Sequence, residues 1–229
     1  MTPYQLKQKE VIDKVEEKLK NNAVDFTTVS PVENWETDNR ICLTSVHILD
    51  GFIRNQIAEK LTKPLWEIAP EHHYYPIEAL HTTIKNIRVI NEPPRFNSED
   101  IQNTEEIFSR VVPAHKTFQA FFYRLIIFPG SLSLVGTTGE ELSNLILDLD
   151  QNLRAKGIMD DKIYSDPKTF FVNVTLARFV KAPADDFKIK VDELNKTISF
   201  DNYVFNSVTL LTCNSVFEKR NIIGSWELK

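Results

Sequence analysis

Two short motifs with the same spacing carry the residue types that phosphate chemistry needs. The first is His81-x-Thr83 in the segment LHTTI, and the second is Asn173-x-Thr175 in the segment VNVTL. In a β-strand, residues i and i+2 point to one face, so each motif would place its two polar side chains together, opposite its apolar neighbours. Two such strands side by side would point all four polar side chains into one cleft.

A cleft with these side chains suits a phosphate ester. Hydroxyl groups donate hydrogen bonds to phosphoryl oxygens, and an imidazole can transfer a proton near neutral pH. Hydrolysis of a cyclic phosphodiester needs a base that activates water and an acid that protonates the leaving oxygen. His81 can take either role. Asn173 can take neither because an amide has no titratable proton, but it can orient a water molecule or a phosphate oxygen. The structural alternative is a core histidine and a polar pair at a strand edge.

Further residues near the motifs are candidates for substrate binding. Strict alternation places Lys85 on the face of His81, where its ammonium group would balance phosphate charge, unless it is a solvated strand lysine. Tyr75 is a candidate for stacking on a base, with core packing as the alternative. Arg178 falls on the face opposite Asn173, which makes it structural unless a β-bulge re-aims it.

The remaining histidines and cysteines give weaker indications. His72 and His73 precede the first motif and could supply the missing proton donor, although exposed loop histidines are the simpler interpretation. Cys42 and Cys213 make neither a metal pattern nor a disulfide framework, so we expect two buried, small apolar side chains. The sequence contains no P-loop, no dinucleotide-binding glycine motif and no metal-ligand spacing. We therefore expect no cofactor and no metal.

Hydrophobic periodicity predicts the elements that would position the motifs. The sequence predicts helices at 3–20, 50–61, 99–112 and 138–157, the last opened by a capping box at Thr138-Gly139-Glu140-Glu141. It predicts strands at 40–49, 72–77, 80–90, 117–128, 131–136, 169–180, 197–200, 204–213 and 222–228. The order strand, helix, motif-bearing strand occurs twice, which indicates a duplicated α+β lobe.

On these residues the chain resembles the two-histidine (2H) phosphoesterases, which include the bacterial 2′-5′ RNA ligase and 2′,3′-cyclic phosphodiesterase group. LHTTI looks like the first H-x-T motif of that family, and FVNVTLARF looks like the second with its histidine replaced by Asn173. The segments YYP, FPGSLSLVG and KGI also resemble the layout of the family. The resemblance implies two pseudo-symmetric lobes, about 38–112 and 113–229, that exchange terminal strands. Each lobe would be an antiparallel sheet with helices outside, around a central cleft. Residues 1–37 would form a helix and loop extension outside the resemblance.

The resemblance also implies a function. It is metal-independent hydrolysis, or the reverse ligation, of a 2′,3′-cyclic phosphate or 2′-5′ phosphodiester in RNA or nucleotides. The catalytic residues would be His81, Thr83, Asn173 and Thr175, and the partner a nucleotide or RNA end with a 2′,3′-cyclic or 2′-phosphate. Loss of one proton-transfer group typically costs about 10²–10⁴-fold in rate. The alternative is therefore a weak or inactive binder of nucleotides or RNA ends, and a protein-interaction module built on the N-terminal helix is a third hypothesis.

Composition bounds these hypotheses. The chain has 229 residues, of which 42% are hydrophobic and 26% charged, which suits one globular domain or a fused pair. Its formal charge of −5 disfavours binding to bulk duplex DNA. No segment approaches the roughly 20 uninterrupted apolar residues of a membrane span, and the N-terminus lacks the apolar core of a signal peptide. We therefore expect a cytoplasmic monomer that binds no membrane.

Overall fold

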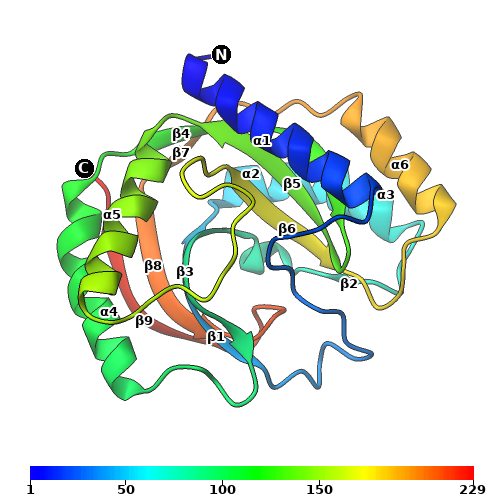
Figure 1. The fold of residues 1–229 in the computed structure, drawn as a ribbon. Helices are drawn as coiled ribbons and strands as arrows, with labels where there is room; N and C mark the ends of the chain where they lie inside the picture. The colour runs from blue at the N-terminus through cyan, green and yellow to red at the C-terminus, as the bar shows by residue number, and fades with distance from the viewer.

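The strands form one curved antiparallel sheet in the computed structural model, which describes all 229 residues (Figure 1). The strands are β1 (Ile41–Ile48), β2 (His73–Tyr74), β3 (His81–Asn91), β4 (Phe118–Phe128), β5 (Ser131–Thr138), β6 (Val172–Arg178), β7 (Tyr203–Phe205), β8 (Ser207–Cys213) and β9 (Arg220–Glu227). The α-helices are α1 (Pro3–Lys20), α2 (Gly51–Ile57), α3 (Lys63–Trp66), α4 (Ser98–Val111), α5 (Glu141–Ala155) and α6 (Asp185–Asn195), with a π-helical turn (Ala58–Thr62) joining α2 to α3. The expected α+β class is confirmed.

The order of strands divides the sheet into two halves. The order is β7-β4-β5-β6-β3-β1-β8-β9, and β2 pairs with the end of β6. The halves meet where β3 pairs with β6, through the single registered pair Thr82 and Val174. The C-terminal strands β8 and β9 extend the half that contains β1 and β3, although they are close in sequence to β7 in the other half. The division into lobes at 112/113 and an extension ending at residue 37 stays a prediction.

Helices cover the sheet on both sides of this junction. α5 contacts β3, α4 contacts β9 and α6 contacts β4. α1 instead lies across β5 on the side of the sheet from which Figure 1 is viewed. Its Ile12 packs in a small buried cluster with Ile126 and Val135. α1 starts with a capping box, because Thr2 accepts a hydrogen bond from Gln5 N–H while the Gln5 side chain accepts one from Thr2 N–H.

Several sequence predictions differ from the structure. The capping box predicted at 138–141 is wrong, because Thr138 is the last residue of β5 and its hydroxyl donates to Gly139 O, so α5 starts without a side-chain cap. No strand occupies 197–200, and the strand predicted at 204–213 is divided between β7 and β8. Helix α6 was not predicted, because only Phe187 and Val191 are buried along it and its apolar stripe is short. None of the helices combines the length and the apolar character that crossing a bilayer requires.

Candidate active site

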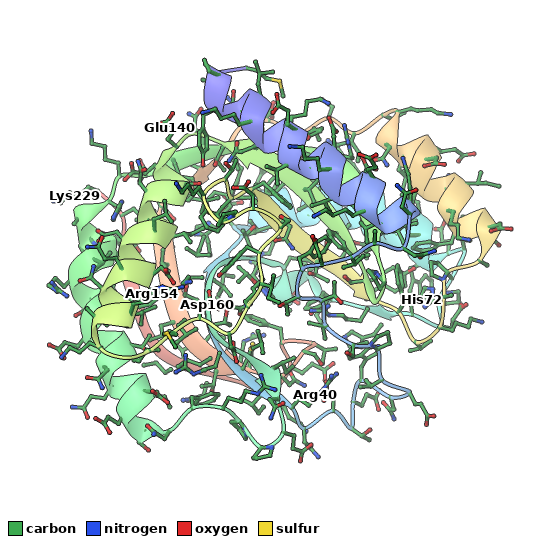
Figure 2. The ribbon with its side chains drawn as sticks, in the orientation of Figure 1. Arg40, His72, Glu140, Arg154, Asp160 and Lys229 are labelled. Carbon is green, nitrogen blue, oxygen red and sulfur yellow. The ribbon has the colours of Figure 1, made fainter.

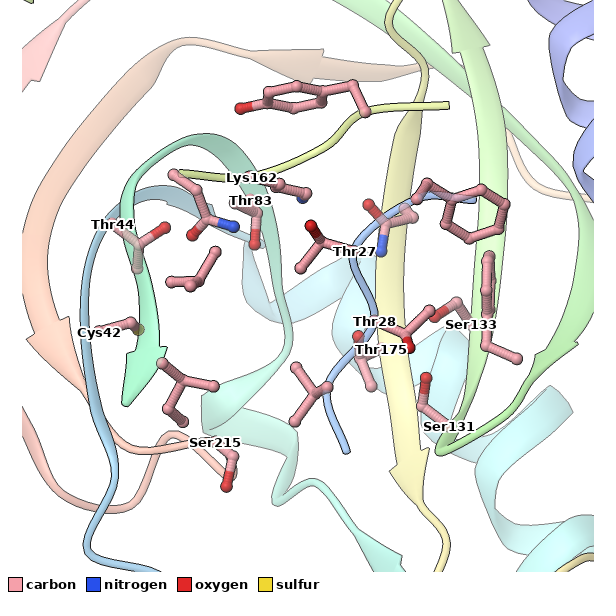
Figure 3. A pocket seen from close by; sticks show the side chains of 18 of the residues that line it. Thr27, Thr28, Cys42, Thr44, Thr83, Ser131, Ser133, Lys162, Thr175 and Ser215 are labelled. Carbon is pink, nitrogen blue, oxygen red and sulfur yellow. The ribbon is translucent and has the colours of Figure 1, made fainter. Parts of the chain in front are cut away.

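The two motifs lie on adjacent strands and face one cavity of about 340 Å³ (Figure 3). Because Thr82 and Val174 pair in an antiparallel register, His81 lies opposite Thr175, and Thr83 lies opposite Asn173. All four side chains line the cavity, whereas their apolar neighbours Leu80, Val172 and Val174 do not. The structure therefore brings the four predicted residues together around an approximate twofold axis.

The imidazole of His81 is held in one orientation. Its Nδ1 lies 2.7 Å from Ala79 O, and since a carbonyl only accepts, Nδ1 carries the proton and Nε2 is left with a lone pair. Phe217 stacks on the ring with centroids 4.0 Å apart. Burial, assisted by the charges of Arg178 and Arg220, lowers the pKa of His81 to about 4. His81 is thus neutral near pH 7 and can accept a proton through Nε2.

A β-bulge follows each motif at the equivalent position. On β3, Thr83 pairs with Val46 while Lys85 pairs with Ser45, so Ile84 is an extra residue. On β6, Thr175 pairs with Ser133 while Ala177 pairs with Leu132, so Leu176 is extra. A bulge shifts the alternation by one residue, and every side chain beyond it changes face. Asn86 on β3 and Arg178 on β6 lie beyond the bulges and line the cavity.

The bulge on β3 explains why the expectation for Lys85 is wrong. Lys85 points away from the cavity and is only 2% exposed. Its ammonium group donates to Asp150 at 2.9 Å and also binds Asp160. Figure 2 shows Asp160 beside Arg154, near the C-terminal end of α5. Lys85 therefore joins β3 to α5 and to the loop that follows α5, and it has no free charge to offer a phosphate.

The bulge on β6 has the opposite consequence for Arg178. Strict alternation along the sequence placed Arg178 on the face opposite Asn173, but the bulge turns its side chain toward the cavity. Its Nε lies 3.3 Å from both the hydroxyl of Tyr75 and Ser215 O. The guanidinium carbon lies 5.9 Å from the ring centroid of Trp35. Since Arg178 lines the cavity and forms no salt bridge, it supplies positive charge to the site.

Tyr75 supports these side chains and has little surface to offer a base. It is 5% exposed, its hydroxyl donates to Ser215 O, and its ring packs edge-on to His81 with centroids 6.0 Å apart. His72 and His73 do not line the cavity. His72 packs between Phe179 and Phe187, so the structure does not place the missing proton donor on it.

Two loops complete the cavity, and sequence reasoning missed both. The strap (residues 26–30) follows α1 and lines the cavity with Thr27 and Thr28. Thr27 N–H donates to Ile163 O at 2.9 Å, and Ile163 N–H donates to the Thr27 hydroxyl at 2.8 Å. This joins the strap to the α5–β6 loop (residues 156–171). The strap passes so close to Gly130 that a β-carbon there would lie 2.7 Å from Val29 O, which explains the glycine.

Other lining residues come from the strands beside the motifs. Ser131 and Ser133 are two positions apart on β5 and pair with Arg178 and Thr175, so they share their face. Their alternation in SLSLVG is a signal that could have placed them. Cys42 and Cys213 are buried as expected, but they also line the cavity and touch, with Sγ atoms 3.4 Å apart. No group of three or more His, Cys, Asp or Glu side chains is arranged to hold a metal ion.

Comparison with known proteins gives information about the fold of this chain. The sequence matches no family model and no curated protein. Among solved structures, Escherichia coli LigT is 15% identical with a TM-score of 0.56, covering 83% of this chain and 98% of its own. A phosphoesterase has 15% identity and a TM-score of 0.55 over 83% of this chain and 99% of its own. A conserved Agrobacterium tumefaciens protein of unknown function has 14% identity and a TM-score of 0.61, covering 91% and 98%. The chain has the LigT-like fold, so the expected resemblance to 2H phosphoesterases is confirmed for the fold.

Proposed function

We propose that this chain is a 2H phosphoesterase-like hydrolase of 2′,3′-cyclic phosphates or 2′-5′ phosphodiesters at a nucleotide or RNA end. One observation carries the proposal: the H-x-T and N-x-T motifs pair across the centre of the sheet and point four polar side chains into one cavity. The proposed catalytic residues are His81, Thr83, Asn173 and Thr175. The cavity is large enough for a phosphate group with a sugar attached, at about 340 Å³.

The charges around the cavity support an anionic ligand. Its charged lining residues are Arg40, Lys162 and Arg178 against the single carboxylate Asp166. Arg40 is paired with Asp38 at 2.9 Å, whereas Lys162 and Arg178 form no salt bridge. A cavity with two unpaired cations in a chain of net charge −5 is suited to bind a phosphate diester locally.

The hydrolytic steps follow from the chemistry of the side chains. Neutral His81 accepts a proton from water through Nε2, and the water oxygen forms a bond to phosphorus. The bond from phosphorus to one ribose oxygen breaks, and that oxygen takes up a proton. The hydroxyls of Thr83 and Thr175 donate to phosphoryl oxygens, and Arg178 offsets the charge that develops on them. Asn173 orients a phosphate oxygen or a water molecule through its amide. E. coli LigT, which has the same fold, has been solved in complex with 3′-AMP and with NADP+, which supports nucleotides as the ligand class.

A pair of adjacent threonines gives a matched test. Thr83 faces the cavity, whereas Thr82 is buried on the other face with its hydroxyl unpaired. Hydrolysis of 2′,3′-cyclic AMP and calorimetric binding of 3′-AMP would be measured for Thr83→Val, Thr82→Val and His81→Ala. We expect Thr83→Val to weaken both, His81→Ala to lower turnover by about 10²-fold or more, and Thr82→Val to leave both unchanged. If wild type neither binds nor hydrolyses these nucleotides, the proposal fails.

A second candidate is nucleotide or RNA-end binding without turnover. Asn173 favours it, because the position lacks a titratable group. Binding of 3′-AMP that depends on His81 and Thr83, together with a hydrolysis rate no higher than buffer, would establish this function in place of the enzymatic one.

A further inference from the structure

Lys162 reaches the cavity from the α5–β6 loop, next to the first motif. Figure 3 shows its side chain close to Thr83, on the side of the cavity away from Thr175. Lys162 lines the cavity together with His81, Asn173 and Arg178. No sequence pattern indicated it, because it lies in a loop outside both motifs.

The ammonium group of Lys162 has no partner in the protein. It forms no hydrogen bond and no salt bridge, and its Nζ lies 5.0 Å from the centroid of the Tyr164 ring. Two acids directly precede Lys162 in sequence, and both are already engaged. Asp161 Oδ1 accepts Val89 N–H at 2.7 Å, and Asp161 Oδ2 lies 3.5 Å from the guanidinium group of Arg95. The other acid is Asp160. Its Oδ1 accepts the backbone N–H of Lys162 at 2.8 Å, and its Oδ2 binds Lys85 and the Tyr164 hydroxyl. An unpaired cation in a cavity is in place for an anionic ligand.

The surroundings of Lys162 also make its proton easier to release. Burial is the main cause that lowers the pKa of Lys162, and the positive charges of Lys85 and Arg178 act in the same direction. The charged and titratable groups that face it are Asp160 and Tyr164 from its own loop, Lys85 from β3, Arg178 from β6 and Cys42 from β1. Asp160 and Cys42 act in the opposite direction, but burial and the two cations outweigh them, so the pKa of Lys162 is lowered on balance.

We propose that Lys162 is the second proton-transfer group of this site and the cation that receives the phosphate, in the role that Asn173 cannot fill. The proposal rests on the hydrolytic function above. In the step, His81 Nε2 takes a proton from water, and the water oxygen forms a bond to phosphorus. The bond from phosphorus to one ribose oxygen breaks, and that oxygen takes a proton from the Lys162 ammonium. The product is a phosphate monoester, and solvent returns the proton from His81 to Lys162.

The arginine, phenol and carboxylate side chains of the cavity do not offer this chemistry. Arg178 stays protonated at all accessible pH values. The Tyr75 hydroxyl donates to Ser215 O, and the Tyr164 hydroxyl donates to Asp160. Burial raises the pKa of both phenols. Asp166 accepts two backbone N–H groups, from Lys168 and Thr169, and therefore acts as a loop anchor.

The test separates charge from proton transfer. Lys162→Met removes both, and Lys162→Arg keeps the charge but cannot release a proton at neutral pH. Lys168→Met is the control, because Lys168 is exposed on the same loop and lies outside the cavity. We expect Lys162→Met to weaken 3′-AMP binding and to lower kcat for 2′,3′-cyclic AMP by about 10²–10⁴-fold. Lys162→Arg should bind normally, lose kcat and lose the alkaline limb of the pH–rate profile.

A second variant tests the same role from the position of Asn173 on β6. Asn173→His places an imidazole at the symmetry-related position, so it should recover at least about tenfold of the rate lost in Lys162→Met. The inference is overturned if wild type hydrolyses the substrate and Lys162→Met or Lys162→Arg hydrolyses it equally well. Absence of both binding and hydrolysis in wild type would instead refute the proposed function, and with it the basis for this role.

Discussion

The buried salt bridge of Lys85 provides a prediction that depends on the structure alone. Lys85 and Asp160 are 2% and 4% exposed, and Asp150, the second partner, is 24% exposed. Lys85→Met keeps most of the side-chain volume but leaves the carboxylate of Asp160 buried without its cation. Breaking a buried pair from one side typically costs about 3–5 kcal/mol, which we expect as the loss in free energy of unfolding.

A second lysine serves as the matched control. Lys9 also binds an aspartate, Asp13, at 2.7 Å, but the two side chains are 39% and 45% exposed. Because exposed pairs contribute about 0–1 kcal/mol, Lys9→Met should change the unfolding free energy by no more than that. Both variants replace a lysine that binds an aspartate with methionine, so they differ mainly in how deeply the ion pair is buried.

Equilibrium urea unfolding at pH 7 measures both. With a slope of about 3 kcal/mol per molar urea, Lys85→Met should lower the midpoint by about 1–2 M. The loss should persist in about 1 M NaCl, which screens exposed pairs far more than buried ones. Lys85→Met combined with Asp160→Asn should be more stable than Lys85→Met alone, since no unpaired charge remains. A loss below about 1 kcal/mol, or one that salt removes, would refute the assignment of a buried, energetically coupled pair.

Two further predictions concern the cavity. The pKa of His81 is lowered to about 4 in the folded protein, whereas it is about 6.5 in the unfolded chain. As the pH falls between these values, only the unfolded chain binds the proton. The free energy of unfolding should therefore decrease toward pH 4 by up to about 3 kcal/mol. His81→Asn should flatten this part of the stability profile in urea titrations at several pH values, and equal slopes for both proteins would contradict the lowered pKa. Cys42 and Cys213 are registered partners with Sγ atoms 3.4 Å apart, so diamide should form one intramolecular disulfide in the folded protein, seen by mass spectrometry as the loss of two hydrogens. Cys42→Ser should prevent it, and thiols that react only after unfolding would show that the pair is closed to the reagent.

The sequence predicted the strands and the faces of the motifs because both depend on local rules. Alternation along a strand places His81 with Thr83 and Asn173 with Thr175 wherever the strand lies. Hydrophobic periodicity located the long elements, including β3, β4 and α5, and the order of elements indicated the duplicated α+β arrangement. The weakly amphipathic α6 lacked such a pattern and was missed, and the short β7 was predicted as part of the same strand as β8.

Beyond each motif, the faces were decided by pairing between strands. The bulges at Ile84 and Leu176 exist because the partner strands offer one residue where β3 and β6 offer two. They exchange the expected places of Lys85 and Arg178, so the lysine joins a buried ion pair and the arginine enters the cavity. A single sequence carries no local signal of where a partner strand loses register.

The amino-acid sequence by itself determined which residue types could bind a phosphate and that position 173 carries an amide without a titratable proton, because composition and spacing are properties of the chain. Tertiary structure alone decided what surrounds those residues. The strap lies far from both motifs in sequence, and its hydrogen bonds at Thr27 join it to the α5–β6 loop, which places Lys162 at the cavity. The lowered pKa of His81 likewise arises from burial beneath Phe217 and from arginines on β6 and β9. Burial and the distances between charges depend on the folded structure and cannot be read from the order of residues.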